Sequence, residues 1–272
     1  MRGLILSFCL LQSSLSVASV LEDLKTFQTF DNLTIRGKIM RPAGKAGRMP
    51  GVLLIHGSGP FDMNSWMPGY LSYDGQPHKA FETIAQTLAD KGIVTFRYNK
   101  RGMTDQPDGG PIIDNSIYNA ATVDILAKDA AEALKILKAD PNVDPNKIVV
   151  LGLSQGTMIA PLVAKASGGV WRLVLMSSIG SGGNADLIAS LKLPALLLHG
   201  EVDNITPMSE LAMIVDSMGK AGVPFKKITY PGLGHGFSPD TSPRLTLGPI
   251  RQDVVDAIPA WINQATLDSH TL

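Results

Sequence analysis

The sequence has almost no cysteine, no excess charge of either sign and no apolar run long enough to cross a bilayer. Its single cysteine is Cys9, and its 24 lysines and arginines are matched by 24 aspartates and glutamates. We find no basic stripe, which argues against nucleic acid and anionic membrane surfaces as partners. Apolar residues make up 44% and charged residues 18% of the 272 positions. This composition supports a large core and excludes a disordered chain.

The first 18 residues differ from the rest of the chain. Arg2 gives a positive start, residues 4–11 form a short apolar run, and residues 16–18 (Ser-Val-Ala) place small side chains before a cleavage point. We therefore predict a signal peptide over residues 1–18 and a secreted or periplasmic protein without a stable membrane anchor. The alternative is a buried N-terminal helix of a cytosolic protein. Cleavage would leave residues 19–272 with no thiol for a disulfide or a cysteine nucleophile.

The most informative stretch is residues 147–158, KIVVLGLSQGTM. Its apolar run 148–151 is typical of a buried strand, and the residues from Thr157 onward can begin a helix. Between them, GLSQG fits the Gly-x-Ser-x-Gly pattern of a nucleophile elbow, in which two glycines permit a turn sharp enough to hold the Ser154 hydroxyl above the sheet. The alternative is a Gly-rich turn that merely ends a core strand. The flanking strand and helix favour Ser154 as a nucleophile.

Strand-like and helix-like segments alternate along the chain, which predicts an α/β fold with a mostly parallel sheet and right-handed crossovers. The first two strand-like runs are joined by Asp31-Asn32 and indicate an antiparallel hairpin at a sheet edge. The predicted strands are residues 25–30, 33–40, 51–55, 93–98, 148–151, 171–177, 193–198 and 226–230. The predicted helices are residues 79–91, 120–139, 207–219 and 248–265, together with the helix after the elbow.

A serine nucleophile needs an adjacent base, and that base needs a third group to orient it. His235, between two glycines, and Asp203 each follow a predicted strand, as Ser154 does. The carboxyl ends of parallel strands share one edge of a sheet, so we expect the three side chains to meet. Asp203 would orient His235, which would take the Ser154 proton. Alternatively, Asp203 could cap the helix that begins near Pro207.

Other titratable residues suit structural roles better. Glu201 is a weaker candidate than Asp203 for orienting a histidine, and Asp129 and Asp216 are expected on the solvent faces of helices. His199 and His56 each lie where a predicted strand ends, and we expect both to brace loops by hydrogen bonds.

An acyl-transfer site also requires N–H donors for an oxyanion. The Gln155 N–H lies at the start of the helix after the elbow, where it would point at that charge. The strand 51–55 runs into His-Gly-Ser-Gly-Pro, which leaves N–H groups free at the same sheet edge. We therefore predict Ser58 N–H as the second donor.

These motifs resemble the serine α/β-hydrolase superfamily, in particular bacterial esterases and dipeptidyl aminopeptidase/acylaminoacyl-peptidase-like hydrolases. The resemblance covers about residues 26–261 and rests on HGSGP, GLSQG, HGEVD followed by Pro207, and GHG, in that order. It implies an α/β-hydrolase fold in a single domain over residues 19–272: a mostly parallel eight-stranded sheet with helices on both faces. The order Ser, Asp, His is also that of the superfamily.

Two departures from the superfamily pattern bear on the site. Related enzymes usually carry aspartate where this chain has Asn99, and they often insert a helical lid where this chain has only the short, Gly/Ser-rich residues 178–191. We therefore expect little or no lid, with the site open or covered by the loops 61–78 and 103–119. The aromatic residues of the first loop could form a substrate wall or simply pack that loop onto the body.

The sequence thus predicts a serine hydrolase that cleaves small-molecule carboxylic esters of short to medium acyl length through an acyl-enzyme. It shows no metal-binding cluster and no nucleotide loop, so no cofactor and no metal are implied. The alternatives are an aminopeptidase or thioesterase using the same residues, and a non-catalytic binding protein that keeps the fold. The sequence makes no prediction of oligomeric state.

Overall fold

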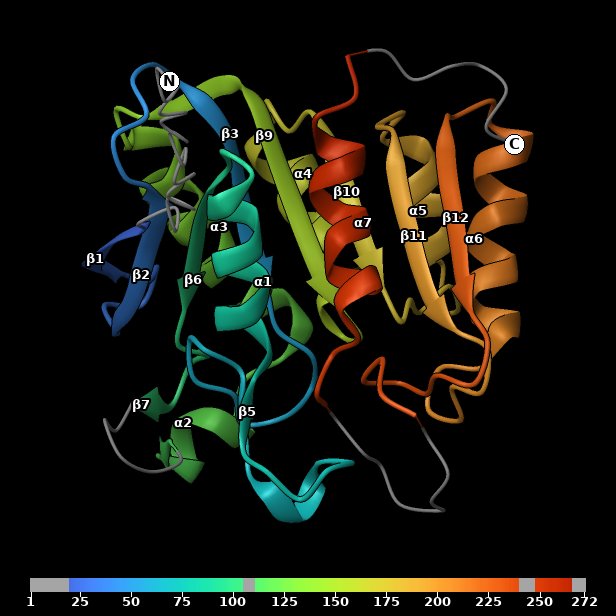
Figure 1. Ribbon diagram of the computed structural model, residues 1–272, viewed down its shortest axis with the longest axis horizontal. Coiled ribbons are helices and arrows are strands. Elements are labelled where there is room, and N and C mark those ends of the chain that lie inside the picture. The colour runs from blue at the N-terminus through green and yellow to red at the C-terminus, as the bar shows by residue number, and fades with distance from the viewer. Residues whose placement is uncertain (1–19, 105–110, 240–247, 266–272) are drawn as a thin grey trace, which may run out of the picture.

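The computed structural model describes residues 20–104, 111–239 and 248–265. One sheet of eight strands passes through the molecule, with helices on both of its faces (Figure 1). Across the sheet the strands are β1 (Val20–Gln28), β2 (Thr34–Pro42), β6 (Val94–Tyr98), β3 (Met49–Ile55), β9 (Val143–Leu153), β10 (Arg172–Met176), β11 (Ala195–Gly200) and β12 (Phe225–Tyr230). The predicted eight-stranded sheet is confirmed. The predicted signal peptide, residues 1–18, lies outside the described residues.

The strands from β6 to β12 are parallel to one another, whereas β1 and β2 form an antiparallel hairpin at one edge. The predicted edge hairpin is confirmed, although β1 begins at Val20 rather than at Lys25. Every residue of β10 and β11 is buried. Strands covered on both faces show continuous apolar runs instead of alternation, which is why the sequence marks them clearly.

The helices divide between the two faces of the sheet (Figure 1). One face packs against α1 (Ala80–Asp90) and α7 (Gln252–Ile262). The other face packs against α3 (Val123–Ala139), α4 (Gly156–Ser167), α5 (Asn184–Ser190) and α6 (Met208–Lys220). The two apolar layers fix the sheet between them, and so fix the edge from which the site residues project.

Three helical segments differ from their predictions. The last, predicted over residues 248–265, spans only Gln252–Ile262 as α7. The predicted helix 120–139 begins only at Val123, because Thr122 caps it by accepting the Ile125 N–H at 3.3 Å, and the separate short helix α2 (Asn115–Asn119) precedes it. The segment 178–191 contains α5, which its Gly/Ser content did not indicate. One seven-residue helix is too small to form a lid of several helices.

Small elements gather at the carboxyl ends of the parallel strands (Figure 1). The loop after β3 holds the antiparallel pair β4 (Trp66–Met67) and β5 (His78–Lys79), with a 3₁₀ turn at Gly69–Leu71 between them. The loop after β6 holds the pair β7 (Met103–Thr104) and β8 (Ile112–Ile113). Tyr70 is 85% exposed, so this aromatic side chain does not pack its loop onto the body. Within the described residues, no helix combines the length and apolar character that a membrane crossing requires.

Candidate active site

Ser154 occupies a strained turn between β9 and α4. Its φ is +54°, a left-handed backbone conformation that is rare for a non-glycine residue, and its N–H is held by the Met176 carbonyl of β10 at 2.9 Å. A Cβ on Gly152 would lie 2.2 Å from the Gly156 carbonyl oxygen, and one on Gly156 would lie 2.3 Å from the Ile55 oxygen. Both positions therefore require glycine, as the elbow pattern predicts.

The structure brings Ser154, His235 and Asp203 together. Ser154 Oγ lies 2.9 Å from His235 Nε2, and His235 Nδ1 lies 2.9 Å from Asp203 Oδ2 and 3.1 Å from Oδ1. The three residues follow β9, β12 and β11, and all three are buried. The order and spacing place a histidine between a hydroxyl and a carboxylate, which is the geometry of a serine nucleophile with its base and orienting group.

Asp203 is held by the turn that precedes α6. Its Oδ1 accepts the N–H groups of Ile205 and Thr206 at 2.9 and 2.8 Å, and its Oδ2 accepts the Thr206 hydroxyl at 2.6 Å. Burial alone would raise the pKa of the Asp203 carboxyl, but the hydrogen bonds from His235 and Thr206 outweigh burial and leave the pKa below its ordinary value. Asp203 therefore stays charged at neutral pH. The helix cap of α6 is Pro207, so the alternative that Asp203 caps this helix does not hold.

Neighbouring groups fix the position of the histidine loop. Ser177 donates its hydroxyl to the His235 carbonyl at 2.7 Å. The parallel register pairs Met176 of β10 with Leu153 of β9, so the next residues, Ser177 and Ser154, lie side by side where the two strands end. His199 is fully buried and binds the Thr206 carbonyl through Nε2 at 2.7 Å. Burial lowers the pKa of His199, so it is a neutral brace, as predicted.

The loop after β3 lies directly against the elbow. Ile55 pairs with Gly152 across the two strands, and a Cβ on Gly57 would lie only 3.2 Å from the Ser154 Cβ. Among the described residues, the N–H groups of Ser58 and Gln155 donate to no protein acceptor. Both predicted oxyanion donors are therefore available on loops that border Ser154.

His56 stiffens the start of this loop. Its Nε2 lies 2.9 Å from the Asp62 carbonyl oxygen, and its ring stacks on Phe81 with centroids 4.7 Å apart. Complete burial and the nearby Lys100 charge lower the pKa of His56 to about 3, so the ring remains neutral. The predicted bracing role agrees with these contacts. Further along, Asn99 accepts the Met63 N–H at 2.7 Å, which ties this loop to the end of β6.

Lys100 is the main residue of the site that the sequence did not indicate. Only 5% exposed, it donates through Nζ to the carbonyls of Gly57 at 2.7 Å and Gly59 at 3.3 Å and to Gln155 Oε1 at 3.1 Å. Burial lowers its pKa to about 8. A lysine in a loop is ordinarily exposed, so nothing local in the sequence distinguishes Lys100 from a surface residue.

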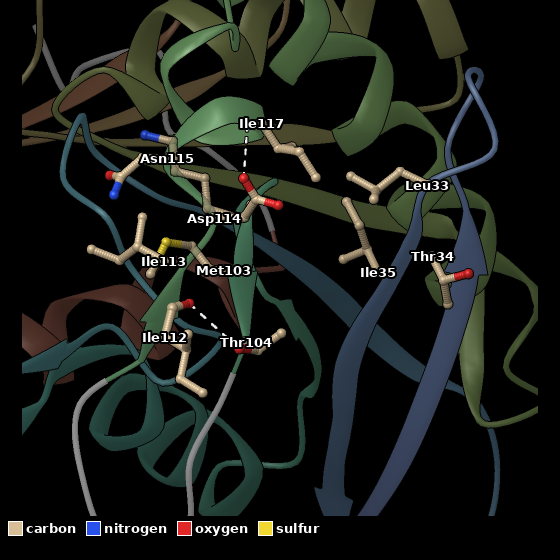
Figure 2. Close-up of a pocket in the computed structure, with 12 residues that line it drawn as sticks. Leu33, Thr34, Ile35, Met103, Thr104, Ile112, Ile113, Asp114, Asn115 and Ile117 are labelled. Carbon is tan, nitrogen blue, oxygen red and sulfur yellow. Dashed lines mark hydrogen bonds between the residues drawn. The ribbon is translucent and has the colours of Figure 1, made fainter.

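A pocket of about 530 Å³ lies between the start of β2, the β7–β8 pair and α2 (Figure 2). Lys100 is one of its lining residues. Half of the twelve residues that line it have apolar side chains: Leu33, Ile35, Met103, Ile112, Ile113 and Ile117. Because Lys100 also binds the Gly57 carbonyl, this pocket and the loop after β3 share that side chain as part of their walls.

Arg101, the next residue, turns to a different cluster. It binds both carboxylate oxygens of Asp129, at 2.8 and 2.7 Å, and both of Asp31, at 2.6 and 2.9 Å. The expectation that Asp129 faces solvent is wrong: it is 1% exposed, because the guanidinium of Arg101 compensates its charge inside the protein. No set of three His, Cys, Asp or Glu side chains in the described ranges is arranged to hold a metal ion.

Comparison with known proteins places this geometry in context. Residues 73–266 match the sequence profile of the dienelactone hydrolase family. The chain is 38% identical over 132 residues to the esterase EstD of Thermotoga maritima, an alignment that covers 48% of this chain but only 27% of EstD.

Solved structures show the same architecture at low sequence identity. A dienelactone hydrolase described as putative, from Klebsiella pneumoniae, superposes with a TM-score of 0.67 at 15% identity, over 90% of this chain and 99% of that one. The acylaminoacyl peptidase of Pyrococcus horikoshii superposes with a TM-score of 0.68 at 17% identity, over 93% of this chain and 43% of that one. The α/β-hydrolase fold and the resemblance to esterases and acylaminoacyl-peptidase-like hydrolases, both predicted from the sequence, are confirmed.

Proposed function

The chain belongs to the dienelactone hydrolase family, and on this premise we propose that it is a serine hydrolase that cleaves small-molecule carboxylic esters through an acyl-enzyme. The observation that carries the proposal is the hydrogen-bonded path from Ser154 through His235 to Asp203, with distances of 2.9 Å at both steps. Its likeness in sequence to the esterase EstD supports an ester as the substrate.

In the proposed reaction, Ser154 Oγ attacks the ester carbonyl while His235 Nε2 takes the hydroxyl proton. The resulting oxyanion accepts hydrogen bonds from the N–H groups of Ser58 and Gln155, and Asp203 stabilises the imidazolium. His235 then gives its proton to the alcohol oxygen, the C–O bond breaks and the alcohol leaves. Water, deprotonated by His235, attacks the acyl-enzyme and releases the acid, and the proton returns to Ser154.

Hydrolysis of p-nitrophenyl esters from acetate to palmitate tests the proposal. We expect the wild type to hydrolyse the short and medium esters and Ser154→Ala to lose about 10⁴-fold or more in kcat, because the nucleophile is gone. Ser190→Ala, which changes an exposed serine on α5, is the matched control and should behave like the wild type. A fluorophosphonate probe should label Ser154 in the wild type and in the control.

The outcomes separate this proposal from its rivals. If the folded wild type were no faster than Ser154→Ala on every ester, the esterase proposal would fail. Probe labelling in that case, with turnover of thioesters or aminoacyl amides instead, would indicate another acyl transfer on the same residues. Folded protein that neither labels nor turns over any of these substrates would indicate a binding protein.

A further inference from the structure

The buried ammonium of Lys100 makes contact with both residues that supply the candidate oxyanion donors. It binds the carbonyls of Gly57 and Gly59, which flank Ser58, and it binds the side-chain oxygen of Gln155. Its acceptors in the described part of the chain are three uncharged oxygens, one for each ammonium N–H. A single side chain therefore links the loop after β3 to the elbow.

The contact with Gly57 acts on the oxyanion donor itself. The Gly57 C=O and the Ser58 N–H belong to one peptide group, which is trans. In a trans peptide the C=O and the N–H point in opposite directions. With Lys100 bound at the oxygen, the Ser58 N–H must point away from Lys100, and the ammonium polarises the peptide so that this N–H becomes a stronger donor.

Tyr118 supports the same loop from α2. Its hydroxyl donates to the Ser58 carbonyl at 2.6 Å, so the peptide after Ser58 is fixed as well as the peptide before it. Lys100 Nζ lies 5.6 Å from the centroid of the Tyr118 ring. The two side chains together leave the backbone of Ser58 little freedom to rotate.

We propose that Lys100 is a positioning residue of the oxyanion hole, which holds the Ser58 N–H and Gln155 in the orientation that the transition state requires. This inference rests on the proposed function. Lys100 does not touch the reacting atoms in this account. It acts through the Gly57–Ser58 peptide and the Gln155 side chain, and its effect appears when negative charge develops on the substrate oxygen.

The protonation state of Lys100 should then matter. Below its pKa of about 8 the ammonium supplies three N–H donors to three acceptors; above it, the neutral amine has two N–H groups and a lone pair facing an oxygen. Burial keeps His56 neutral and raises the pKa of Tyr118, so neither group that faces the ammonium changes charge near pH 8. Asp114, which lines the pocket with Lys100, has a lowered pKa and stays charged there too.

The test compares Lys100→Met with Lys138→Met on a p-nitrophenyl ester that the wild type hydrolyses. Lys138 also donates to a backbone carbonyl, that of Gly168 at 2.7 Å, and is only partly buried, so it controls for the loss of a lysine–carbonyl bond. We expect Lys100→Met to lower kcat about 10- to 100-fold with KM within about threefold, because only transition-state stabilisation is lost. Affinity for a boronic acid, which forms a tetrahedral adduct on serine, should fall by a similar factor. Lys138→Met should change neither quantity.

A folded Lys100→Met with wild-type kcat and boronate affinity overturns the inference and leaves the proposed function intact. An inactive wild type overturns both. If Lys100→Met does not fold, Lys100→Gln, which keeps two N–H donors but no charge, takes its place, with a loss in kcat and in boronate affinity expected. Wild-type values of both in a folded Lys100→Gln contradict the inference. In the wild type, kcat should also decline as the Lys100 ammonium loses its proton, above about pH 8.

Discussion

Lys100 and Arg101 are consecutive residues at the end of β6, and they are 5% and 6% exposed, yet their charges are compensated in different ways. Arg101 binds the carboxylates of Asp129 and Asp31, and these hydrogen bonds hold its pKa above the ordinary value. Lys100 binds three uncharged oxygens, and burial lowers its pKa. Two neighbouring cations thus have opposite pKa shifts because one has carboxylate partners and the other has carbonyl partners.

A buried cation can stabilise the fold, as Arg101 does, or lie next to a candidate active site, as Lys100 does. The Arg101 guanidinium is compensated at contact distance by two carboxylates, and it joins the β1–β2 turn to α3. The Lys100 ammonium keeps its field, at a cost in desolvation that its hydrogen bonds only partly offset. That cost suits a group placed beside a site where negative charge would develop in the proposed reaction.

The largest expected difference between the two cations is in stability. Arg101→Met leaves the buried Asp129 carboxylate without its cation, so we expect a loss of about 3 kcal/mol in the free energy of unfolding. Lys100→Met leaves no carboxylate unpaired, because Lys100 binds only uncharged oxygens among the described residues. We expect it to lower the free energy of unfolding by about 1 kcal/mol or less. Urea denaturation at neutral pH measures both values. Equal losses of unfolding free energy in the two variants would show that the carboxylate partners of Arg101 add no stability beyond that of ordinary hydrogen bonds.

The pH dependence of stability sharpens the comparison. A lysine in the unfolded chain titrates near pH 10.4, whereas Lys100 in the folded protein has a pKa of about 8. Between these values the unfolded state binds more protons, so Lys100 makes the free energy of unfolding rise with pH, by up to about 1 kcal/mol per pH unit. Urea denaturation from about pH 7 to 10 should therefore show the free energy of unfolding of the wild type rising relative to that of Lys100→Met. A constant difference between the two would mean that Lys100 titrates normally.

The smallest expected effect concerns Tyr118. Tyr118→Phe removes one neutral hydrogen bond to the Ser58 carbonyl, which is worth about 1 kcal/mol and corresponds to about a fivefold loss in kcat. This loss should be smaller than that of Lys100→Met, which removes a charged donor to three acceptors. Steady-state kinetics of the two variants on one ester give the order. A larger loss of kcat in Tyr118→Phe than in Lys100→Met would show that Tyr118 of α2, and not Lys100, mainly positions the loop after β3.

The sequence predicted those parts of the molecule that are encoded locally. The central strands are short apolar runs, the edge hairpin alternates around turn residues, and the elbow is a five-residue pattern, so all three could be read without knowledge of distant contacts. The juxtaposition of Ser154, His235 and Asp203 also follows, because all three end strands that share one edge of the sheet.

Long-range polar contacts could not be predicted in the same way. Lys100 reaches acceptors 43 and 55 positions away, and Arg101 pairs with Asp129 over 28 positions. Without those partners, a charged side chain in a loop or on a helix indicates a surface residue. The cap at Thr122 and the helix α5 were missed for a different reason: short polar segments hold too little apolar periodicity to define where a helix begins.

The Asp203 carboxylate accepts hydrogen bonds from two backbone N–H groups, the Thr206 hydroxyl and His235, so its lone pairs are already occupied in the resting protein. When His235 becomes charged in the proposed reaction, this anion does not have to rotate or shed water to face it. The reorganisation energy of that step is therefore small, because the dipoles around the new charge were oriented when the chain folded.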